Sequence, residues 1–173
     1  AESIIEVALD AGIRVGFVYS ESKVSVAFGR TGTPTISIYC DAPYDPYDPT
    51  LPVSSRAEYL RNISDYAMSI IDSFYPYIAS GEEAMVVIDY PEPDSSGHTH
   101  GPLSSYYREV LKVLDGEIGR VVAYLKELGL WDNTLFMLFT DHSMVEVNPE
   151  LDVLSSDGEH IVGLPLDHIV VPI

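Results

Sequence analysis

Residues 84–139 contain the feature that most restricts the fold: two short apolar runs separated by a polar segment and a long amphipathic stretch. The runs 84–88 and 135–139 have the length and continuous apolar character of strands that are covered on both faces. Between them, residues 107–128 place apolar side chains on one helical face until Gly129. This order predicts two parallel strands joined by a right-handed crossover.

The remaining chain supplies further regular elements. Residues 4–9 have helical spacing and lead into a strand-like segment at 13–19. Two β-rich stretches, 23–28 and 35–40, flank a glycine-bearing turn and are expected to form a hairpin or an edge pair. The whole chain of 173 residues, 46% of them hydrophobic, is long enough for one domain with a real core. We therefore expect a single α/β domain over residues 1–173, with a mostly parallel sheet flanked by helices.

A long helix is expected after a segment rich in proline and tyrosine, residues 41–52, which favours loop geometry. Tyrosines of this loop either pack against neighbouring prolines or stack on a base. Ser55, followed by Glu58 three residues later, has the pattern of a capping box. The apolar face of the helix is formed by Tyr59, Leu60, Ile63, Ala67, Ile70, Ile71 and Phe74.

Charge and cysteine content exclude several classes of function. Nine basic residues against 27 acidic ones give a formal charge of -18, so the averaged surface repels nucleic-acid backbones and anionic lipids. We expect no nucleic-acid binding. The apolar runs are too short to cross a bilayer, and Cys40 has no CxxC partner that would indicate zinc or redox chemistry. The sequence does not distinguish a cytoplasmic from a secreted protein and does not fix the oligomeric state.

Two pairs of polar residues follow the two predicted strands. Asp94 and His98 lie four residues apart in a turn-rich stretch, 89–102, and Asp141 and His142 directly follow the second run. A carboxylate and a neutral imidazole suit zinc or a similar divalent ion, although the first pair alone would also suit a hydrogen bond within a loop. If the crossover is right, both pairs lie at one edge of the sheet, close enough to serve two metal ions about 4 Å apart.

These segments resemble the type I phosphodiesterase and nucleotide pyrophosphatase branch of the alkaline phosphatase superfamily. The resemblance lies within residues 85–144 and is carried by 90–102, Leu114-Asp115, Ile118-Gly119, Asp132-Asn133-Thr134 and 140–144. It implies part of an alkaline-phosphatase-like core, in which Asp94 and His98 bind one divalent ion and Asp141 and His142 bind the other. The resemblance implies zinc, with manganese as the alternative. It also implies a covalent phospho-enzyme or nucleotidyl-enzyme intermediate, and phosphodiesters, pyrophosphates or monoesters as small substrates.

The chain departs from the family pattern in two ways. Ser143 stands where the family has glycine, which adds a side chain at a tight turn. The family's Thr or Ser nucleophile is expected upstream of Ala1, so we expect a fragment, or a naturally split or degenerate relative, that turns over little substrate alone. Thr31, Thr33 and Thr35 occupy a glycine-rich turn and are expected to form that turn, not to act as the nucleophile.

A late histidine completes the candidate set. His160 is placed similarly to a late histidine of the related cofactor-independent phosphoglycerate mutases, and is either a further metal ligand or an exposed loop residue. His100 is compatible with a substrate contact, and His168 is expected to be structural.

Three functions remain open for the chain. The first is a metal-dependent hydrolase of phosphodiester or nucleotide pyrophosphate bonds. The others are a noncatalytic metal-binding domain and phosphomutase-type phosphoryl transfer, which only His160 suggests.

Overall fold

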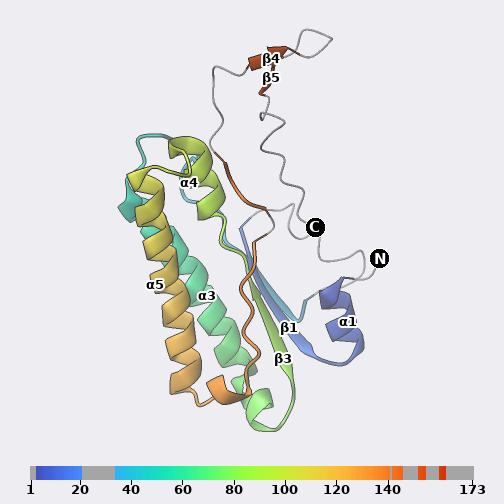
Figure 1. Cartoon of the computed structure of the whole chain (residues 1–173). Helices are drawn as coiled ribbons and strands as arrows, with labels where there is room; N and C mark the ends of the chain where they lie inside the picture. Colours follow the sequence, from blue (N-terminus) through green and yellow to red (C-terminus); the bar gives the residue numbers. More distant parts are fainter. Residues whose placement is uncertain (1–2, 21–33, 141, 146–151, 155–159, 163–173) are drawn as a thin grey trace. The chain divides into compact units, whose positions relative to one another are not determined.

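The protein divides into two compact units, residues 1–139 and 140–173, and each is described by itself. The expectation of one domain over residues 1–173 stays a prediction. In the computed structural model (Figure 1), the larger unit is α/β, with a three-stranded parallel sheet flanked by helices, which confirms the predicted fold class. The residues described are 3–20, 34–140, 142–145, 152–154 and 160–162.

The sheet of the larger unit consists of β1 (Arg14–Tyr19), β2 (Ile36–Tyr39) and β3 (Ala84–Ile88), in the order β2-β1-β3. Both pairs of neighbours are parallel, so the carboxyl ends of all three strands lie at one edge. The strand predicted at 35–40 therefore pairs with β1. Its other predicted partner, 23–28, lies outside the described residues.

Helix α1 (Ile4–Asp10) covers one face of the sheet. Its first turn is closed by a true capping box, because the Ser3 hydroxyl accepts from the Glu6 N–H and the Glu6 carboxylate accepts from the Ser3 N–H. A turn at 11–12 then leads into β1. The helix packs through Ile5 and Ala8 against Val15 of β1.

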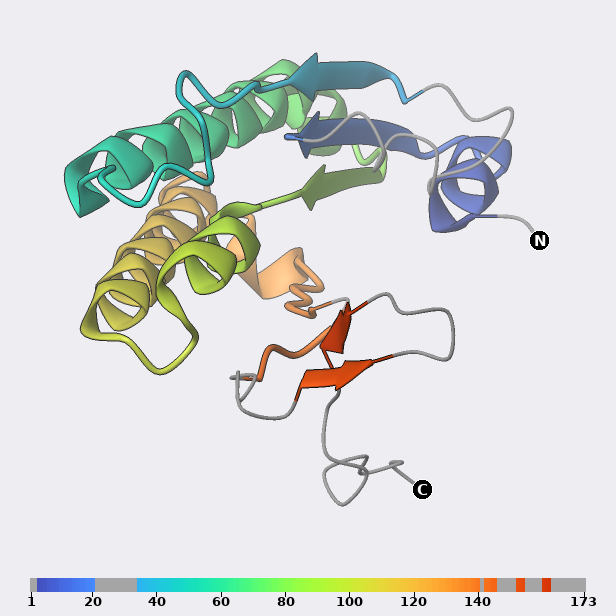
Figure 2. The same cartoon turned by 90° about the horizontal axis from the view of Figure 1, so that it is seen from above.

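Helix α3 (Val53–Ala79) covers the opposite face, and α5 (Ser105–Glu127) lies beside α3 (Figures 1 and 2). Side chains alternate across a strand, so Val15 meets α1 while Val18 meets α3. Both long helices and the apolar stripe of the first are confirmed. The core under α3 is formed by Val18, Cys40, Tyr59, Ile63, Ala67, Ile70 and Phe74.

The predicted capping box at Ser55 and Glu58 is wrong. Helix α3 begins at Val53, with Pro52 as the N-cap residue in extended geometry and no side-chain cap. The Ser55 N–H already donates to the Pro52 carbonyl at 3.1 Å. Because proline fixes its own φ and has no N–H to satisfy, the chain enters the helix before it reaches the serine.

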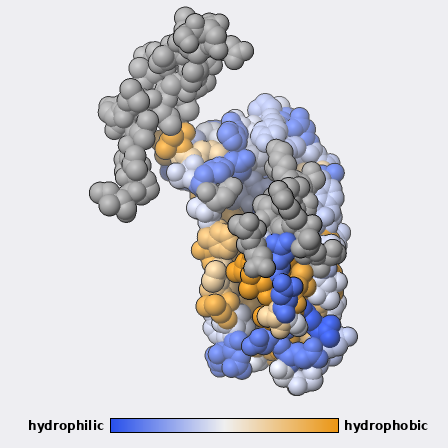
Figure 3. Space-filling view, turned by 90° about the vertical axis from the view of Figure 1, so that its right-hand side faces the viewer, coloured by the Kyte–Doolittle hydropathy of each residue, from blue (hydrophilic) through white to orange (hydrophobic). Residues whose placement is uncertain are grey.

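The predicted strand at 135–139 is also wrong. After a short 3-10 turn, η1 (Trp131–Asn133), these residues form no ladder with any described strand, and Leu135 and Phe139 are 85% and 77% exposed. Figure 3 shows hydrophobic surface gathered on one side of the larger unit. An apolar run specifies what a strand would bury, but a strand forms only if another strand's backbone pairs with it. The predicted crossover from β3 to this run is therefore not found in the part of the chain described.

The smaller unit contains β4 (Asp152–Leu154) and β5 (His160–Val162), which pair antiparallel. Residues 142–145 have no regular structure. Among the helices of the described ranges, none combines the length and the apolar character that a bilayer span requires.

Candidate functional site

Asp94 and His98 lie on a helix, α4 (Glu92–His100), and not in the loop that the sequence predicts. The helix begins after Pro91 and ends at Gly101, whose φ of +82° takes the chain out of helical geometry. The carboxylates of Glu92 and Asp94 in its first turn complement the positive end of the helix dipole. A helix fixes the spacing between the two candidate ligands more closely than a loop would.

The Asp94 and His98 side chains lie one turn apart on the same face of α4. His98 Nε2 is 3.4 Å from Asp94 Oδ1, and the two side chains are 60% and 38% exposed. A carboxylate oxygen and an imidazole nitrogen thus lie close together, as two ligands of one divalent ion would. The pair fits half of a metal site.

The other predicted ligands belong to the smaller unit. Asp141 lies outside the described residues. His142 is exposed, with Nδ1 3.2 Å from the Ser143 carbonyl oxygen, and His160 begins β5. Their predicted position beside Asp94 stays a prediction, and the crossover that supported it is not found. Within the residues that the structure describes, no three His, Cys, Asp or Glu side chains converge as a metal site would require.

His100 lies against Tyr106 of α5. The two rings are stacked, with centroids 3.6 Å apart. Burial, and to a lesser degree the nearby Arg56 charge, lower the pKa of the His100 imidazole, so it stays neutral at neutral pH. The structure therefore gives this histidine a packing role against α5.

A pocket of 330 Å³ lies next to Asp94. The loop 41–52 forms one wall through Tyr44 and Tyr47, and α4 forms the other through Glu92 and Asp94. Tyr47 also reaches His98, with ring centroids 6.5 Å apart in edge-on geometry. The candidate ligand pair therefore borders a half-open aromatic pocket.

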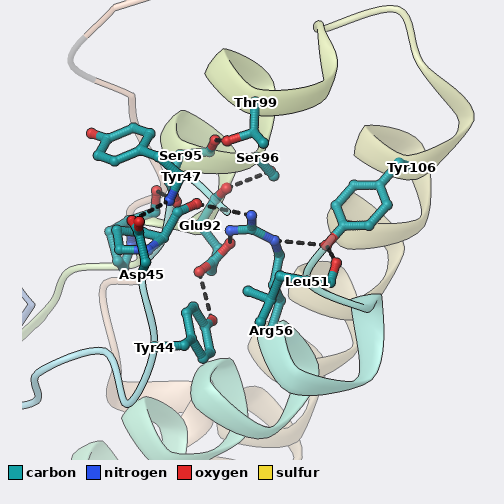
Figure 4. A network of polar contacts seen from close by, with 12 residues as sticks. Tyr44, Asp45, Tyr47, Leu51, Arg56, Glu92, Ser95, Ser96, Thr99 and Tyr106 are labelled. Atoms are coloured by element: carbon teal, nitrogen blue, oxygen red, sulfur yellow. Dashed lines mark hydrogen bonds and ion pairs between the residues drawn. The ribbon is translucent and has the colours of Figure 1, made fainter. Parts of the chain in front are cut away.

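A buried ion pair adjoins the pocket through Glu92 (Figure 4). The side chains of Arg56, on α3, and Glu92, on α4, are both fully buried and paired. Tyr44 donates to Glu92 Oε1 at 2.7 Å. Burial, together with this hydrogen bond, raises the pKa of the Tyr44 hydroxyl, so Tyr44 remains a donor across the ordinary pH range.

A second polar contact fixes the carboxyl edge of the sheet. At the end of β1, the Ser20 hydroxyl and N–H both donate to Asp89 Oδ2, at 2.6 Å and 3.2 Å. Asp89 directly follows β3 and precedes the segment that enters α4. The start of α4 is therefore held from two directions, by this bond at the sheet and by Arg56 from α3.

The sequence analysis missed the roles of Arg56 and Glu92, although one signal was present. Arg56 lies three, four and seven residues before Tyr59, Leu60 and Ile63, so it falls on the buried stripe of its own helix. A charged residue on a buried stripe indicates a buried partner. The pattern does not identify the partner, because Glu92 is 36 residues away.

Comparison with known proteins agrees with the resemblance seen in residues 85–144. The chain is 39% identical over 70 residues to bis(5'-adenosyl)-triphosphatase ENPP4 of Bos taurus, covering 40% of this chain and 15% of that protein. It is 45% identical over 53 residues to ectonucleotide pyrophosphatase/phosphodiesterase family member 1 of Mus musculus, covering 31% of this chain and 6% of that protein. The matched segments thus span a small part of these relatives. The model of the family described as type I phosphodiesterase / nucleotide pyrophosphatase matches residues 1–160 of the 173. The chain therefore belongs to that family.

Proposed function

We propose that this chain supplies the metal ligands of a two-metal site for hydrolysis of phosphodiester or nucleotide pyrophosphate bonds. The observation that supports the proposal best is the Asp94–His98 pair, which converges on one face of α4 beside a pocket, in a chain of the type I phosphodiesterase / nucleotide pyrophosphatase family. By resemblance, Asp141 and His142 hold a second ion, and His160 adds a ligand to the first. Zinc, or else manganese, is the metal proposed.

Asp94 and His98 would hold one ion, and the rest of the pocket would position the substrate. The chemistry that a divalent ion supplies in such a site is neutralisation of a phosphoryl oxygen and a lower pKa for a hydroxyl nucleophile. Tyr44 and Tyr47 give the pocket an aromatic wall that excludes water from one side of the substrate.

Small nucleotides are the substrates that we propose. The names of two relatives, a bis(5'-adenosyl)-triphosphatase and an ectonucleotide pyrophosphatase/phosphodiesterase, support this class. The pocket volume of 330 Å³ is in the range of small-molecule sites. The net charge of -18 makes longer nucleic acids poor partners.

A noncatalytic metal-binding domain is the second candidate. The observation that favours it is that only two candidate ligands converge in the part of the chain described.

An activity assay distinguishes the two functions. Bis(p-nitrophenyl) phosphate and p-nitrophenyl phosphate are offered with added Zn²⁺ or Mn²⁺ to this chain and to any longer form of the same protein. We expect diester hydrolysis in a longer form that contains the nucleophile. A longer form that binds metal and hydrolyses neither ester would contradict the hydrolase proposal.

A further inference from the structure

We propose that Arg56 is a positioning residue that holds the tyrosine-bearing loop 41–52 against α4 and so sets the shape of the pocket beside Asp94. The inference deepens the proposed function and rests on it insofar as Asp94 is taken as a metal ligand. No residue of the family resemblance identifies Arg56. The inference starts from how one buried guanidinium is shared among three neighbouring segments.

Each nitrogen of the Arg56 guanidinium donates to a different segment of the chain (Figure 4). Nε donates to the Tyr106 hydroxyl on α5 at 2.8 Å, one terminal nitrogen donates to the Pro46 carbonyl at 2.9 Å, and the other pairs with Glu92 on α4. Tyr106 in turn donates to the Leu51 carbonyl at 2.6 Å, at the end of the same loop. A side chain of α3 therefore ties together the loop, α4 and α5.

These contacts act on both walls of the pocket. Pro46 lies between the pocket tyrosines Tyr44 and Tyr47, and Glu92 lies two residues before Asp94 on α4, which also lines the pocket. The Tyr44 hydroxyl links the loop to α4 a second time by donating to the other oxygen of Glu92. Movement of the loop away from α4 would break contacts to Arg56 and Glu92 together, so the distance between the walls is fixed by this network.

Arginine suits this role for a geometric reason. A planar guanidinium offers five donors in fixed directions, whereas a lysine ammonium is a single point charge on a flexible stem. Arg56→Lys keeps the charge that Glu92 needs but cannot reach Glu92, Pro46 and Tyr106 together. Removal of the charge is a poorer test, because it would leave Glu92 buried without its counter-ion and endanger folding.

Hydrogen exchange of the metal-free chain, followed by mass spectrometry, tests the inference. In Arg56→Lys we expect the amides of 44–51 and of α4 to exchange about tenfold faster, with 4–19 unchanged. Arg14→Lys is the matched control, because Arg14 also pairs with a carboxylate, Glu82, and stacks on a tyrosine, Tyr77, away from the pocket. It should leave the loop and α4 at wild-type rates.

Cobalt binding supplies a readout that general loss of stability would not move. The visible absorption of Co²⁺ reports its ligand geometry, and we expect Co²⁺ affinity to fall about tenfold in Arg56→Lys and to stay unchanged in Arg14→Lys. If Arg56→Lys fails to fold, Tyr44→Phe decides, because it removes only the bond between the loop and Glu92. It should accelerate exchange in 44–51.

The two proposals fail in different ways. Wild-type exchange rates in the loop and α4 of Arg56→Lys, or in the loop of Tyr44→Phe, would overturn the role of Arg56. Equal acceleration throughout, including 4–19, would overturn it too, because it would show a general structural role. Absence of Co²⁺ binding by the wild type, or equal binding by Asp94→Asn, would instead sink the proposed function, and the exchange data would still decide the role of Arg56.

Discussion

Gly16 allows α3 to lie close against the sheet, and its replacement should be costly. A Cβ added at Gly16 would lie inside van der Waals contact of Ile70 Cγ2 and 3.1 Å from Phe74 Cε2. Both side chains belong to the buried face of α3 and are 1% and 2% exposed, so neither has room to move aside. Gly16→Ala is expected to lower the free energy of unfolding by about 1–3 kcal/mol, the usual cost of overpacking.

A double-mutant cycle with Ile70 tests the cause of that loss. Ile70→Ala removes the methyl group that the new Cβ would meet, and alone should cost about 2–5 kcal/mol because it leaves a cavity. In the double variant the added methyl group occupies part of that cavity and no longer meets Ile70. The combined loss should therefore be smaller than the sum of the single losses, by about 1–2 kcal/mol. The Phe74 contact remains, so relief is partial.

Urea unfolding, followed by circular dichroism, measures the free energy of unfolding of all three variants and the wild type. Comparable slopes of this free energy against urea concentration check that all four unfold in the same way. Gly116→Ala is the control. Gly116 is exposed within α5, and an added Cβ there meets nothing within 4 Å, so this change should stabilise the protein by about 0.5–1 kcal/mol. A Gly16→Ala variant as stable as the wild type, or single losses that add to within about 0.3 kcal/mol, would refute the packing argument.

Two smaller perturbations test local features. Ser104 caps α5 by accepting from the Tyr107 N–H at 3.0 Å, so Ser104→Ala should cost about 1 kcal/mol in urea unfolding. Ser55→Ala should change the free energy of unfolding by less than about 0.5 kcal/mol. If Ser55→Ala and Ser104→Ala lost equal stability, the start of α3 would be misplaced. Burial raises the pKa of the Tyr59 hydroxyl above its usual value of 10.0. The folded state therefore keeps this proton at pH values where the unfolded state releases it, and stability falls as pH rises past about 10. Tyr59→Phe should flatten that fall in urea titrations at pH 9 to 11, and a slope equal to that of the wild type would contradict it.

Regular elements with strong hydrophobic periodicity could be predicted from the sequence. The stripe of α3 states which face of that helix is buried, and the structure confirms it. The structure also confirms the α5 helix and the β3 strand, although the residues of β3 are half-buried and Leu111 of the α5 stripe is exposed. Residues 135–139 show where prediction from an apolar pattern fails. These residues are as apolar as those of β3, but strand formation depends on a pairing partner that periodicity does not specify.

Helix α4 could not be predicted because its own residues favour turns. Proline, serine, aspartate and glycine have low helix propensity, and the helix is held by contacts to other segments. Arg56 pairs with Glu92 at its start, and the Tyr44 hydroxyl of the loop 41–52 donates to the same carboxylate at 2.7 Å. The sequence identified Asp94 and His98 as a pair by their spacing. Their convergence became visible only with the helix.

Equilibrium titration with Zn²⁺ of the wild type, Asp94→Ala and Asp141→Ala tests the central claim most directly. Asp132→Ala is the control, because Asp132 is an exposed carboxylate of η1 away from the pocket. If the Asp94–His98 pair and the pair at 141–142 each hold an ion, both alanine variants should bind Zn²⁺ at least about tenfold more weakly, while Asp132→Ala binds as the wild type does. Unchanged affinity and stoichiometry in both Asp94→Ala and Asp141→Ala would contradict the metal site.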